Sequence, residues 1–534
     1  MSAPDRLTQA ISDAYDETPY ISLPIPYTAP GNLRAVAKLY GISAPELRHA
    51  RVLELGCAAG GNLLPFALAY PEAHVVGIDL APQQIEAGKR AAEAVGAGNL
   101  HLHAMSLTEI TPDFGTFDYI ICHGVFSWVP PEVRDAILRI CRTNLAPEGL
   151  AFVSYNIYPG WKASDVIRDA MMLNSFGAQT AHERLARAKD MLELIENGLW
   201  ENNPLQSALQ HTARKLRGQS DHYLLHEYLE AINTPCYFLE FAAAAQQAGL
   251  TYLTDAEPQL SFPSTYSSKV AQGLSGLAVN AGREMREQYL DFAIGRSFRK
   301  SLLIQTERAG AILDQPVGSA FESMFLAADL LPLPAPVGAP PGQRQYRTAS
   351  GTTLTSSDPL AHTLMDLLSE SWPASVPFKA IRDAASTNTP TATVEEITTA
   401  LLAHIIALVQ SSSLHYRLEL SSYQTPQSKP ELIAGALKLL SEATRPGCQV
   451  SMHNLWHQGL TAPDDALSRH IMNMMDGTRT TPELRKAARD ALTAGGYLHP
   501  NGQSYKGARN LEPVAQEFLN ALLTKLRRNG LLLK

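Results

Sequence analysis

The sequence predicts an α/β protein with a mostly parallel sheet in its N-terminal part, followed by helical and winged-helix-like C-terminal domains. Short apolar segments alternate with helical segments over residues 51–155, a pattern typical of parallel strands joined by right-handed crossovers. A proline-rich stretch at 331–343 interrupts the chain, and helices followed by short apolar segments come after it. A chain of 534 residues is too long for one hydrophobic core, so we expect roughly three domains.

The elements of the first half follow from local periodicity. Short apolar runs predict strands at 51–55, 75–78, 100–103, 117–122 and 149–154. Helical spacing between them predicts helices at 62–70, 83–95 and 132–144. Helical spacing continues over 163–232, and it is followed by a predicted helix at 237–247 and a strand at 250–253.

Two similar patterns close the chain. Helices are predicted at 359–370, 378–385 and 393–411, before a strand-like segment at 414–420. A final helix at 512–528 runs into the apolar residues 530–533. Helices followed by a small β-element resemble a winged helix.

Composition excludes several classes of protein. The chain holds 44 basic and 52 acidic residues, a net charge of −8, and residues 341–534 carry a net charge of only +3. We therefore expect no nucleic-acid partner. No apolar run approaches roughly 18 residues, so no membrane span is expected. Five scattered cysteines and an N-terminus without an apolar leader predict a cytoplasmic protein with reduced thiols.

The strongest chemical signal is the segment Val52-Leu-Glu-Leu-Gly-Cys-Ala-Ala-Gly-Gly-Asn62. Its glycines allow a tight turn after a strand, and the next helix begins there, so main-chain N–H groups can face a ligand. Asp79 ends the following strand, where a carboxylate can accept hydrogen bonds from both hydroxyls of a ribose. This spacing alone would also suit a nicotinamide dinucleotide enzyme or a glycine turn in an unrelated α/β domain.

The loop is not G-x-G-x-x-G, and Glu54 stands at the end of its strand. It resembles motif I of the Rossmann-like S-adenosylmethionine-dependent methyltransferases, and Val76-Gly-Ile-Asp79 resembles their motif II. The resemblance implies S-adenosyl-L-methionine as cofactor. It assigns cofactor contacts to Glu54, Gly56, Cys57, Ala58, Gly60, Asn62, Asp79, Leu80, Ser106, Leu107, His123, Gly124 and Val125. Ser106 stands where this family often has an aspartate.

Further motifs narrow the resemblance to a bacterial subgroup with a methyltransferase regulatory domain. They are the segments 121–130, 155–161, 226–229 and 290–299, with Pro19-Tyr20 through Pro30 at the N-terminal side. The subgroup is similar to the rickettsial protein-lysine methyltransferases that modify an outer-membrane protein. The resemblance covers residues 15–306 and continues weakly through Asp476-Gly-Thr-Arg479.

This resemblance implies a protein partner that offers a lysine side chain. It also suggests a division of the chain into a methyltransferase domain, a helical insertion, a regulatory domain, a linker and a C-terminal helical and winged-helix-like region, at 1–162, 163–220, 221–310, 311–350 and 351–534. The additional domains would suit a large substrate or a homodimer interface.

Aromatic residues crowd the predicted substrate side, and aromatic faces stabilise a nearby cation. We assign substrate contacts to Phe126, Trp128, Tyr155, Asn156 and Trp161, and catalytic roles to Tyr27, Trp128 and His123. His123 would act as a general base that removes the proton of a lysine amine, unless water takes it. The alternative for the aromatic residues is simple core packing.

Other signals have ordinary explanations. His222 and His226, like His453 and His457, have a spacing that can bind zinc, but no third ligand stands beside either pair, so no metal is expected. We interpret Arg296, Arg299 and Lys300 as a solvated helix face. Methylation of a small metabolite or cell-surface component is the alternative enzymatic function, and a cofactor-binding scaffold or winged-helix regulator is the non-enzymatic one.

Overall fold

The computed structural model describes residues 22–335, 338–424, 428–445, 450–461, 463, 465–494 and 510–533. The described chain forms two compact units. Ser106–Gly310 make the first unit, and residues 22–105 with 311–533 make the second unit. The predicted contributions of Pro19, Tyr20 and Cys448 lie outside the described residues.

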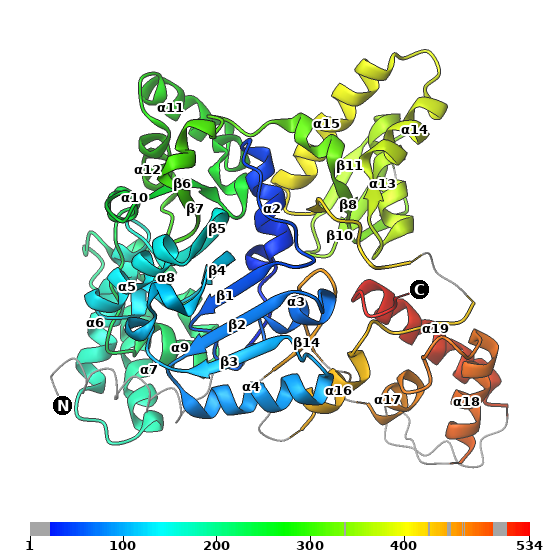
Figure 1. The fold of residues 1–534 in the computed structure, drawn as a ribbon, viewed down its shortest axis with the longest axis horizontal. Coiled ribbons are helices and arrows are strands. Elements are labelled where there is room, and N and C mark those ends of the chain that lie inside the picture. The colour runs from blue at the N-terminus through cyan, green and yellow to red at the C-terminus, as the bar shows by residue number, and fades with distance from the viewer. Residues whose placement is uncertain are drawn as a thin grey trace. The chain divides into compact units, whose positions relative to one another are not determined.

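Three parallel strands open the second unit. Strands β1 (Arg51–Leu55), β2 (His74–Asp79) and β3 (Leu100–Ala104) pair in the order β3-β2-β1. Helices α2 (Pro30–Leu39), α3 (Leu64–Ala69) and α4 (Pro82–Val95) alternate with them, and α4 packs on β2 and β3 (Figure 1). Each predicted strand and helix of this region is present. Buried apolar residues form most of β1 and β2, whereas β3 alternates buried leucines with exposed histidines. The helix predicted from residue 62 begins at Leu64, since the glycine turn extends beyond Gly61.

Four strands form the sheet of the first unit. Strands β4 (Phe117–Cys122), β5 (Leu145–Asn156), β7 (Phe298–Gln305) and β6 (Leu250–Asp255) lie in the order β4-β5-β7-β6. β4 and β5 are parallel, whereas β7 runs antiparallel to both β5 and β6. Helices α5 (Pro131–Thr143), α10 (Phe238–Gln247), α11 (Ser268–Ala278) and α12 (Arg283–Ile294) accompany these strands. The mostly parallel α/β architecture is confirmed.

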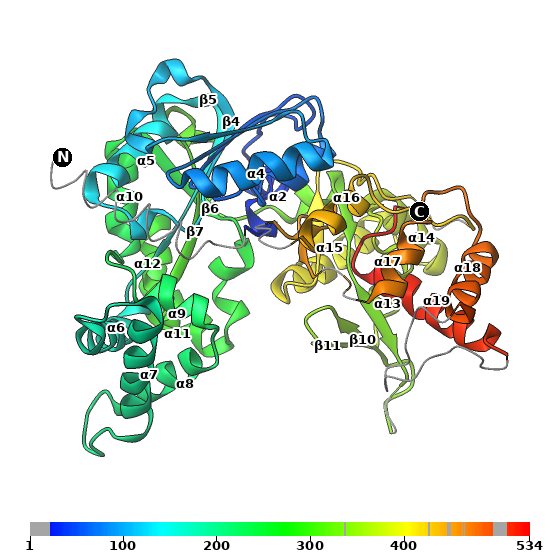
Figure 2. The ribbon, with the colours of Figure 1, turned by 90° about the horizontal axis from the view of Figure 1, so that it is seen from below.

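Four helices form a bundle between β5 and α10. They are α6 (Trp161–Ser175), α7 (Ala181–Asn197), α8 (Gln206–Arg217) and α9 (Asp221–Tyr228), and they lie side by side (Figure 2). We call α6–α9 the helical bundle. Its apolar stripes close over one core that also includes Trp128 and Trp161.

The C-terminal part of the second unit contains two helical groups with small sheets. The first has helices α13 (Pro359–Ser371), α14 (Phe378–Asn388) and α15 (Val394–Gln410) with a sheet of β8 (Phe325–Ala327), β12 (Val376–Pro377) and β13 (His415–Arg417). The second has helices α16 (Ala436–Ala443), α17 (Ala466–Met472), α18 (Thr481–Thr493) and α19 (Glu512–Arg528) with strands β14 (Met452–His453) and β15 (Gly459–Leu460). The predicted winged-helix-like organisation is confirmed.

The proline-rich stretch differs from the expected linker. Strand β9 (Leu330–Leu333) uses its first residues, and β9 pairs with β10 (Arg344–Thr348), which also pairs with β11 (Thr353–Ser356). Pro332 lies opposite Tyr346 in this ladder. We expected proline to prevent strand formation, but β9 is an edge strand, where a missing N–H can be tolerated. Both ends of the stretch lie within the second unit, while the domain boundaries themselves stay a prediction.

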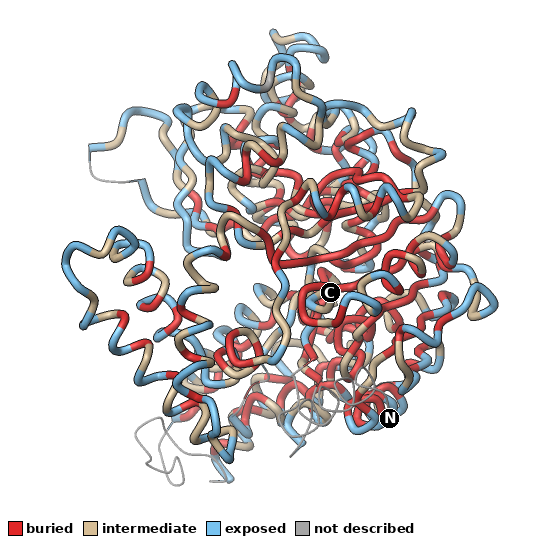
Figure 3. Tube along the Cα trace, turned by 90° about the vertical axis from the view of Figure 1, so that its left-hand side faces the viewer, coloured by how far each residue is buried: buried red, intermediate tan, exposed pale blue. Residues whose placement is uncertain are grey.

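The interpretation of Arg296 and Arg299 as parts of a solvated helix face is wrong, because both side chains are buried. Arg299 lies on β7 and is fully buried. Its guanidinium contacts Asp255 and Asp291 at 2.7 Å each and Glu287 at 2.8 Å. Three carboxylates contributed by β6 and α12 therefore compensate the buried charge. Figure 3 shows the buried residues of the chain in red.

Candidate active site

The glycine loop after β1 has a backbone that only a few residue types adopt. Gly56, Ala58 and Gly60 have positive φ angles of 76°, 49° and 71°. The N–H groups of Gly56 and Cys57 both donate to the carbonyl of Ile78, at 2.8 and 3.0 Å. These bonds fasten the loop to β2, so the loop is held in one conformation at the carboxyl end of the strands.

Asp79 holds the same loop from the end of β2. Its Oδ2 accepts the N–H of Ala58 at 2.8 Å, and its Oδ1 accepts the N–H of Ala81 at 3.0 Å. The carboxylate is only half-buried. A carboxylate oxygen can accept more than one hydrogen bond, so a carboxylate at this position can also bind a ribose hydroxyl. Leu80 follows and is also half-buried.

Glu54 is a buried carboxyl at the end of β1. Its Oε1 accepts a hydrogen bond from Nδ2 of Asn62 at 2.7 Å, whereas its Oε2 has no partner among the residues that the structure describes. Burial raises the pKa of Glu54 to about 8, despite the opposing bond from Asn62. Burial likewise raises the pKa of the Cys57 thiol, which remains protonated at neutral pH. A cation close to Glu54 would offset the cost of its ionisation.

Ser22 and His457, which the sequence analysis did not assign to this site, both support the loop. Ser22 lies beside Gly61 and accepts its N–H at 2.8 Å through Oγ. A Cβ atom on Gly61 would come within 2.2 Å of the Ser22 carbonyl oxygen, so only glycine fits there. His457 contacts Oδ1 of Asn62 at 3.0 Å from the C-terminal part of the second unit. Neither residue has a local signal, because both act across long sequence separations.

The predicted site residues after β3 and β4 lie in the first unit. His123 is half-buried, and its Nδ1 lies 2.9 Å from Oγ of Ser154, which also accepts the N–H of Gly124 at 2.9 Å. Burial, with a contribution from Lys300, lowers the pKa of His123 to about 4, so the imidazole is neutral at pH 7.

The remaining predicted cofactor contacts of this unit differ in exposure. Val125 is half-buried beside the exposed Gly124. Ser106 caps a short 3₁₀ helix by accepting the N–H of Thr108 at 3.3 Å, and Leu107 is buried behind it.

Three buried rings form an aromatic cluster: one follows β4, one lies on β5 and one lies on α10. Tyr155 stacks on Phe241 with ring centroids 3.9 Å apart, and Phe126 meets both rings edge-on at 6.0 and 5.3 Å. The Tyr155 hydroxyl lies 2.9 Å from Oγ of Ser301. The structure thus brings together Phe126 and Tyr155, as the sequence predicted, and adds Phe241 from α10.

The other predicted substrate residues pack in a core or form buried hydrogen bonds. Trp128 is 9% exposed and meets Trp161 edge-on at 6.3 Å, while Trp161 stacks on Tyr228 at 5.5 Å. These rings belong to the core beneath the helical bundle. Asn156 is buried: its N–H donates to Ser127 at 2.8 Å and its Nδ2 donates to Asn233 at 3.0 Å. Trp128 packs beneath the helices of the bundle, and Trp161 is the first residue of α6; their roles as substrate contacts stay predictions.

Tyr27 lies in the second unit, in a 3₁₀ turn formed by Pro26–Thr28. Its ring is half-buried, and its carbonyl accepts Nδ2 of Asn32 at 3.2 Å. Tyr27 therefore shares a unit with the glycine loop, whereas His123 and the aromatic cluster belong to the other unit. The joint action of these two groups stays a prediction.

The histidine pairs occupy different settings. His222 and His226 lie on α9 with ring centroids 4.4 Å apart, and Nδ1 of His226 lies 3.2 Å from Oε1 of Glu230. His453 lies on β14, whereas His457 lies in the turn after it. Within the described residues, no group of three or more histidine, cysteine, aspartate or glutamate side chains is arranged to hold a metal ion.

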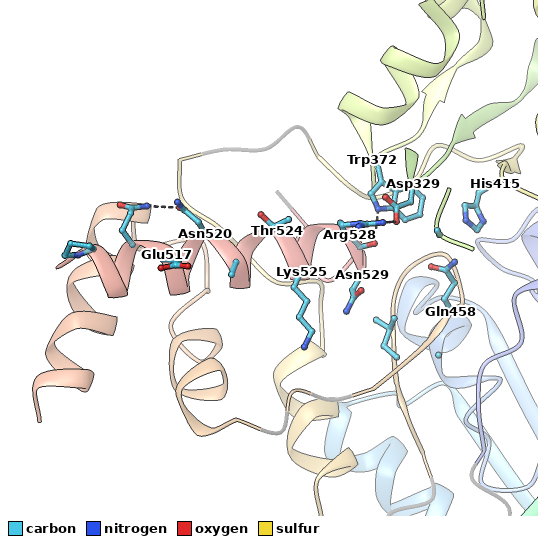
Figure 4. A pocket seen from close by; sticks show the side chains of 16 residues that line it. Asp329, Trp372, His415, Gln458, Glu517, Asn520, Thr524, Lys525, Arg528 and Asn529 are labelled. Carbon is cyan, nitrogen blue, oxygen red and sulfur yellow. Dashed lines mark hydrogen bonds and ion pairs between the residues drawn. The ribbon is translucent and has the colours of Figure 1, made fainter. Parts of the chain in front are cut away.

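A cavity of about 1160 Å³ lies along α19 in the second unit. Figure 4 shows Glu517, Asn520, Thr524, Lys525 and Arg528 of α19 on one side of it, with Trp372 and His415 nearby. None of the predicted site residues lines this cavity. We found no described helix that is both long and apolar enough to cross a membrane.

Comparison with known families finds three matches along the chain. Residues 52–149 match the family described as a methyltransferase domain. Residues 220–305 match the predicted methyltransferase regulatory domain, and residues 440–531 match the PKMT C-terminal winged helix domain. These matches include the glycine loop, strands β6 and β7, and His457.

Two proteins of Rickettsia prowazekii are each 42% identical to the chain. The similarity to uncharacterized protein RP789 extends over 301 residues, 56% of this chain and 54% of that protein, so the chain spans about half the length of this relative. Similarity to uncharacterized protein RP028 extends over 236 residues, 44% of this chain and 94% of that protein.

A solved structure matches almost the entire fold. PKMT2 from Rickettsia typhi is 28% identical with a TM-score of 0.84, covering 96% of this chain and 100% of PKMT2. PKMT2 has also been solved in complex with AdoHcy, and that structure matches with a TM-score of 0.83 at 27% identity, over 97% of this chain and 100% of PKMT2.

Proposed function

We propose that this chain, which belongs to the S-adenosylmethionine-dependent methyltransferases with a methyltransferase regulatory domain, transfers the methyl group of that cofactor to a lysine side chain of a protein. The single observation that carries the proposal is the glycine loop between β1 and α3, fastened by the carboxylate of Asp79. AdoHcy bound to the structurally similar PKMT2 supports the same cofactor here.

The residues of the loop fit an adenosine-containing cation. Asp79 would accept hydrogen bonds from the ribose hydroxyls in addition to those from the N–H groups of Ala58 and Ala81, because a carboxylate oxygen can accept more than one hydrogen bond. Glu54 has an unpartnered, buried Oε2, and a positively charged amine would satisfy that oxygen and favour the ionised carboxylate. When bound, S-adenosylmethionine supplies an electrophilic methyl group on a positively charged sulfur.

Residues of the first unit would bind the lysine that accepts the methyl group. Neutral His123 can accept a hydrogen bond from a lysine amine, but a group with a pKa of about 4 removes a proton from an ammonium poorly. We therefore assign the loss of the lysine proton to water, before the amine binds. The rings of Phe126 and Tyr155 would exclude water and orient the nucleophile, and positioning of this kind accounts for much of enzymatic rate enhancement.

The more specific part of the proposal is that the substrate is a protein. Similarity to PKMT2 extends across the C-terminal domains, and residues 440–531 match the winged helix domain found in PKMT proteins. A lysine is the acceptor that this relationship favours. The net charge of −8 argues against nucleic acid as the partner.

Location and assembly complete the proposal. Cys57, Cys122, Cys141 and Cys236 form no disulfide bond with one another, which supports a location in the reducing cytoplasm. Leu173, Phe176 and Trp200 are 78%, 85% and 68% exposed around the helical bundle. Exposed apolar side chains of this kind support a protein partner or a homodimer, and sedimentation of the purified protein tests the second.

The test is direct methyl transfer. Purified protein is incubated with bacterial lysate and S-adenosylmethionine carrying a labelled methyl group, and peptides are analysed by mass spectrometry. We expect the label on lysine amines, and we expect Asp79→Ala protein to transfer much less label at the same cofactor concentration. Label found only in small molecules, or on other side chains, would contradict the lysine assignment.

A further inference from the structure

Asn62 connects the glycine loop to the C-terminal part of the second unit. Its Oδ1 accepts the N–H of Ile25 at 2.8 Å and lies 3.0 Å from Nε2 of His457. Its Nδ2 donates to Oε1 of Glu54 at 2.7 Å. The N–H of Ile25 can only donate, so the atom that faces it must be the amide oxygen. Nε2 of His457 must then carry a hydrogen and donate to Asn62.

The surroundings of His457 keep it in this donating form. The side chain is 4% exposed, and burial together with Arg417 and His453 lowers its pKa well below the usual value. Arg417 packs over the Trp456 ring, with the guanidinium carbon 4.7 Å from the ring centroid, and donates to the carbonyl of Leu455 at 3.0 Å. The imidazole is therefore a fixed neutral donor throughout the physiological pH range.

A second contact joins the same two regions. Val450 pairs with Ser22 in a parallel β-bridge, and Ser22 in turn accepts the N–H of Gly61. Pro24 lies against Gly459, where an added Cβ would come within 3.4 Å of its ring. Residues 450–459 thus contact the segment 22–28 that supports the loop, so the loop has support from the far end of the chain.

We propose that His457 is a positioning residue for the cofactor: it fixes Asn62, and through Asn62 it fixes the carboxyl of Glu54. This inference rests on the proposed function of the glycine loop. Without the donor on His457, Asn62 keeps its bonds to Ile25 and Thr28 but loses one of the groups that orient its amide, so the hydrogen bond that holds Oε1 of Glu54 in place is weakened. The winged helix region then contributes to cofactor binding without contacting the cofactor itself.

The test compares two substitutions at one position. His457→Leu removes the donor, whereas His457→Gln places an amide N–H close to the position of Nε2. His453→Leu is the matched control, because His453 is a buried histidine of the neighbouring strand whose ring nitrogens have no hydrogen-bond partner among the described residues. Affinity for S-adenosylhomocysteine is measured by calorimetry, and thermal denaturation is followed on the same preparations.

We expect His457→Leu to weaken binding of S-adenosylhomocysteine by about 3- to 10-fold, the range for one hydrogen bond. His457→Gln and His453→Leu should stay within about 2-fold of the wild type, a smaller change than the loss of one hydrogen bond. If the leucine variant does not fold, His457→Asn replaces it: asparagine tolerates the left-handed backbone at φ 62°, and its amide is one methylene too short to place an N–H at the position of Nε2.

Equal affinities for the wild type and the donor-free variant would overturn the inference. So would an equal loss in His453→Leu, which would indicate general destabilisation. A wild-type protein that does not bind S-adenosylhomocysteine at all would instead contradict the proposed function of the loop.

Discussion

Nδ1 of His123 lies 2.9 Å from Oγ of Ser154, and the same oxygen accepts the N–H of Gly124. Ser154 therefore fixes both the ring of His123 and the backbone that follows it. Because burial lowers the pKa of this imidazole to about 4, the group does not change its charge near neutral pH. A histidine that stays neutral in this way can accept a hydrogen bond, but it is too weak a base to remove a proton from the substrate.

We expect kcat/KM for methyl transfer to show no inflection from His123 between pH 6 and pH 8, the range in which an unperturbed histidine would titrate. The profile of His123→Gln should have the same shape with a lower plateau. Rates at saturating cofactor across this range provide the measurement. An inflection near pH 6.5 that disappears in His123→Gln would restore the general-base role.

Asp79→Ala should lose about 1.5–3 kcal/mol of binding free energy for S-adenosylhomocysteine, the range for hydrogen bonds to a charged group. The substitution also removes the acceptor for the N–H of Ala58, so thermal stability is measured alongside calorimetry. Glu72→Ala is a suitable control, since Glu72 is a surface carboxylate of the same unit that pairs with Arg48. Unchanged affinity in folded Asp79→Ala protein would exclude the ribose assignment.

Glu54 should release a proton when the cofactor binds. Its native pKa of about 8 lies above the ordinary value of 4.5, so the free protein holds this proton at pH 7. A bound ammonium would lower the pKa, and about one proton at most would leave. Calorimetry of S-adenosylhomocysteine binding in buffers of different ionisation enthalpy counts that proton, and Glu54→Gln should release none.

The raised pKa of Glu54 also determines how the stability of the free protein changes with pH. Between pH 4.5 and pH 8 the native state keeps a proton that the unfolded chain has lost, so Glu54 makes the free protein less stable as pH rises. Glu54→Gln should flatten that part of the profile of unfolding free energy against pH. A variant with an unchanged slope would show that Glu54 is ionised in the native protein.

Trp128→Ala should lower the free energy of unfolding by about 3–5 kcal/mol, because the ring packs in the core beneath the helical bundle. Trp200→Ala is the matched control: its ring is 68% exposed, and its loss should change stability by no more than about 0.5 kcal/mol. Chemical denaturation measures both. If Trp128 instead lines a lysine channel, the variant will keep its stability and lose turnover.

Much of the α/β architecture could be predicted because each element carries its own signal. The segments 51–55 and 117–122 form β1 and β4 at the predicted residues, since a short buried strand is a continuous apolar run. The positive φ angles at Gly56 and Gly60 likewise follow from a glycine-rich turn between a strand and a helix.

The surroundings of individual side chains could not be predicted in this way. Trp128 appeared suited to a ligand site because it follows β4, but α6–α9 cover it, and their packing has no local signature at Trp128. Arg299 appeared solvated because its acidic partners lie on other elements. His457 is 395 residues away from Asn62, so a single sequence gives no indication of their contact.

The antiparallel pairing of β7 with β5 limits which segments can be deleted from this protein. The segment matched as a regulatory domain, residues 220–305, contains both β6 and β7. Six residues of β5 pair with β7, from Ala151 to Asn156. A shortened protein that ends after β5 would expose this row of N–H and C=O groups as an open sheet edge, a template for aggregation. Deleting the segment would therefore make the protein aggregate, and any effect on regulation would be hidden. Point substitutions in the segment can test regulation without exposing the sheet edge.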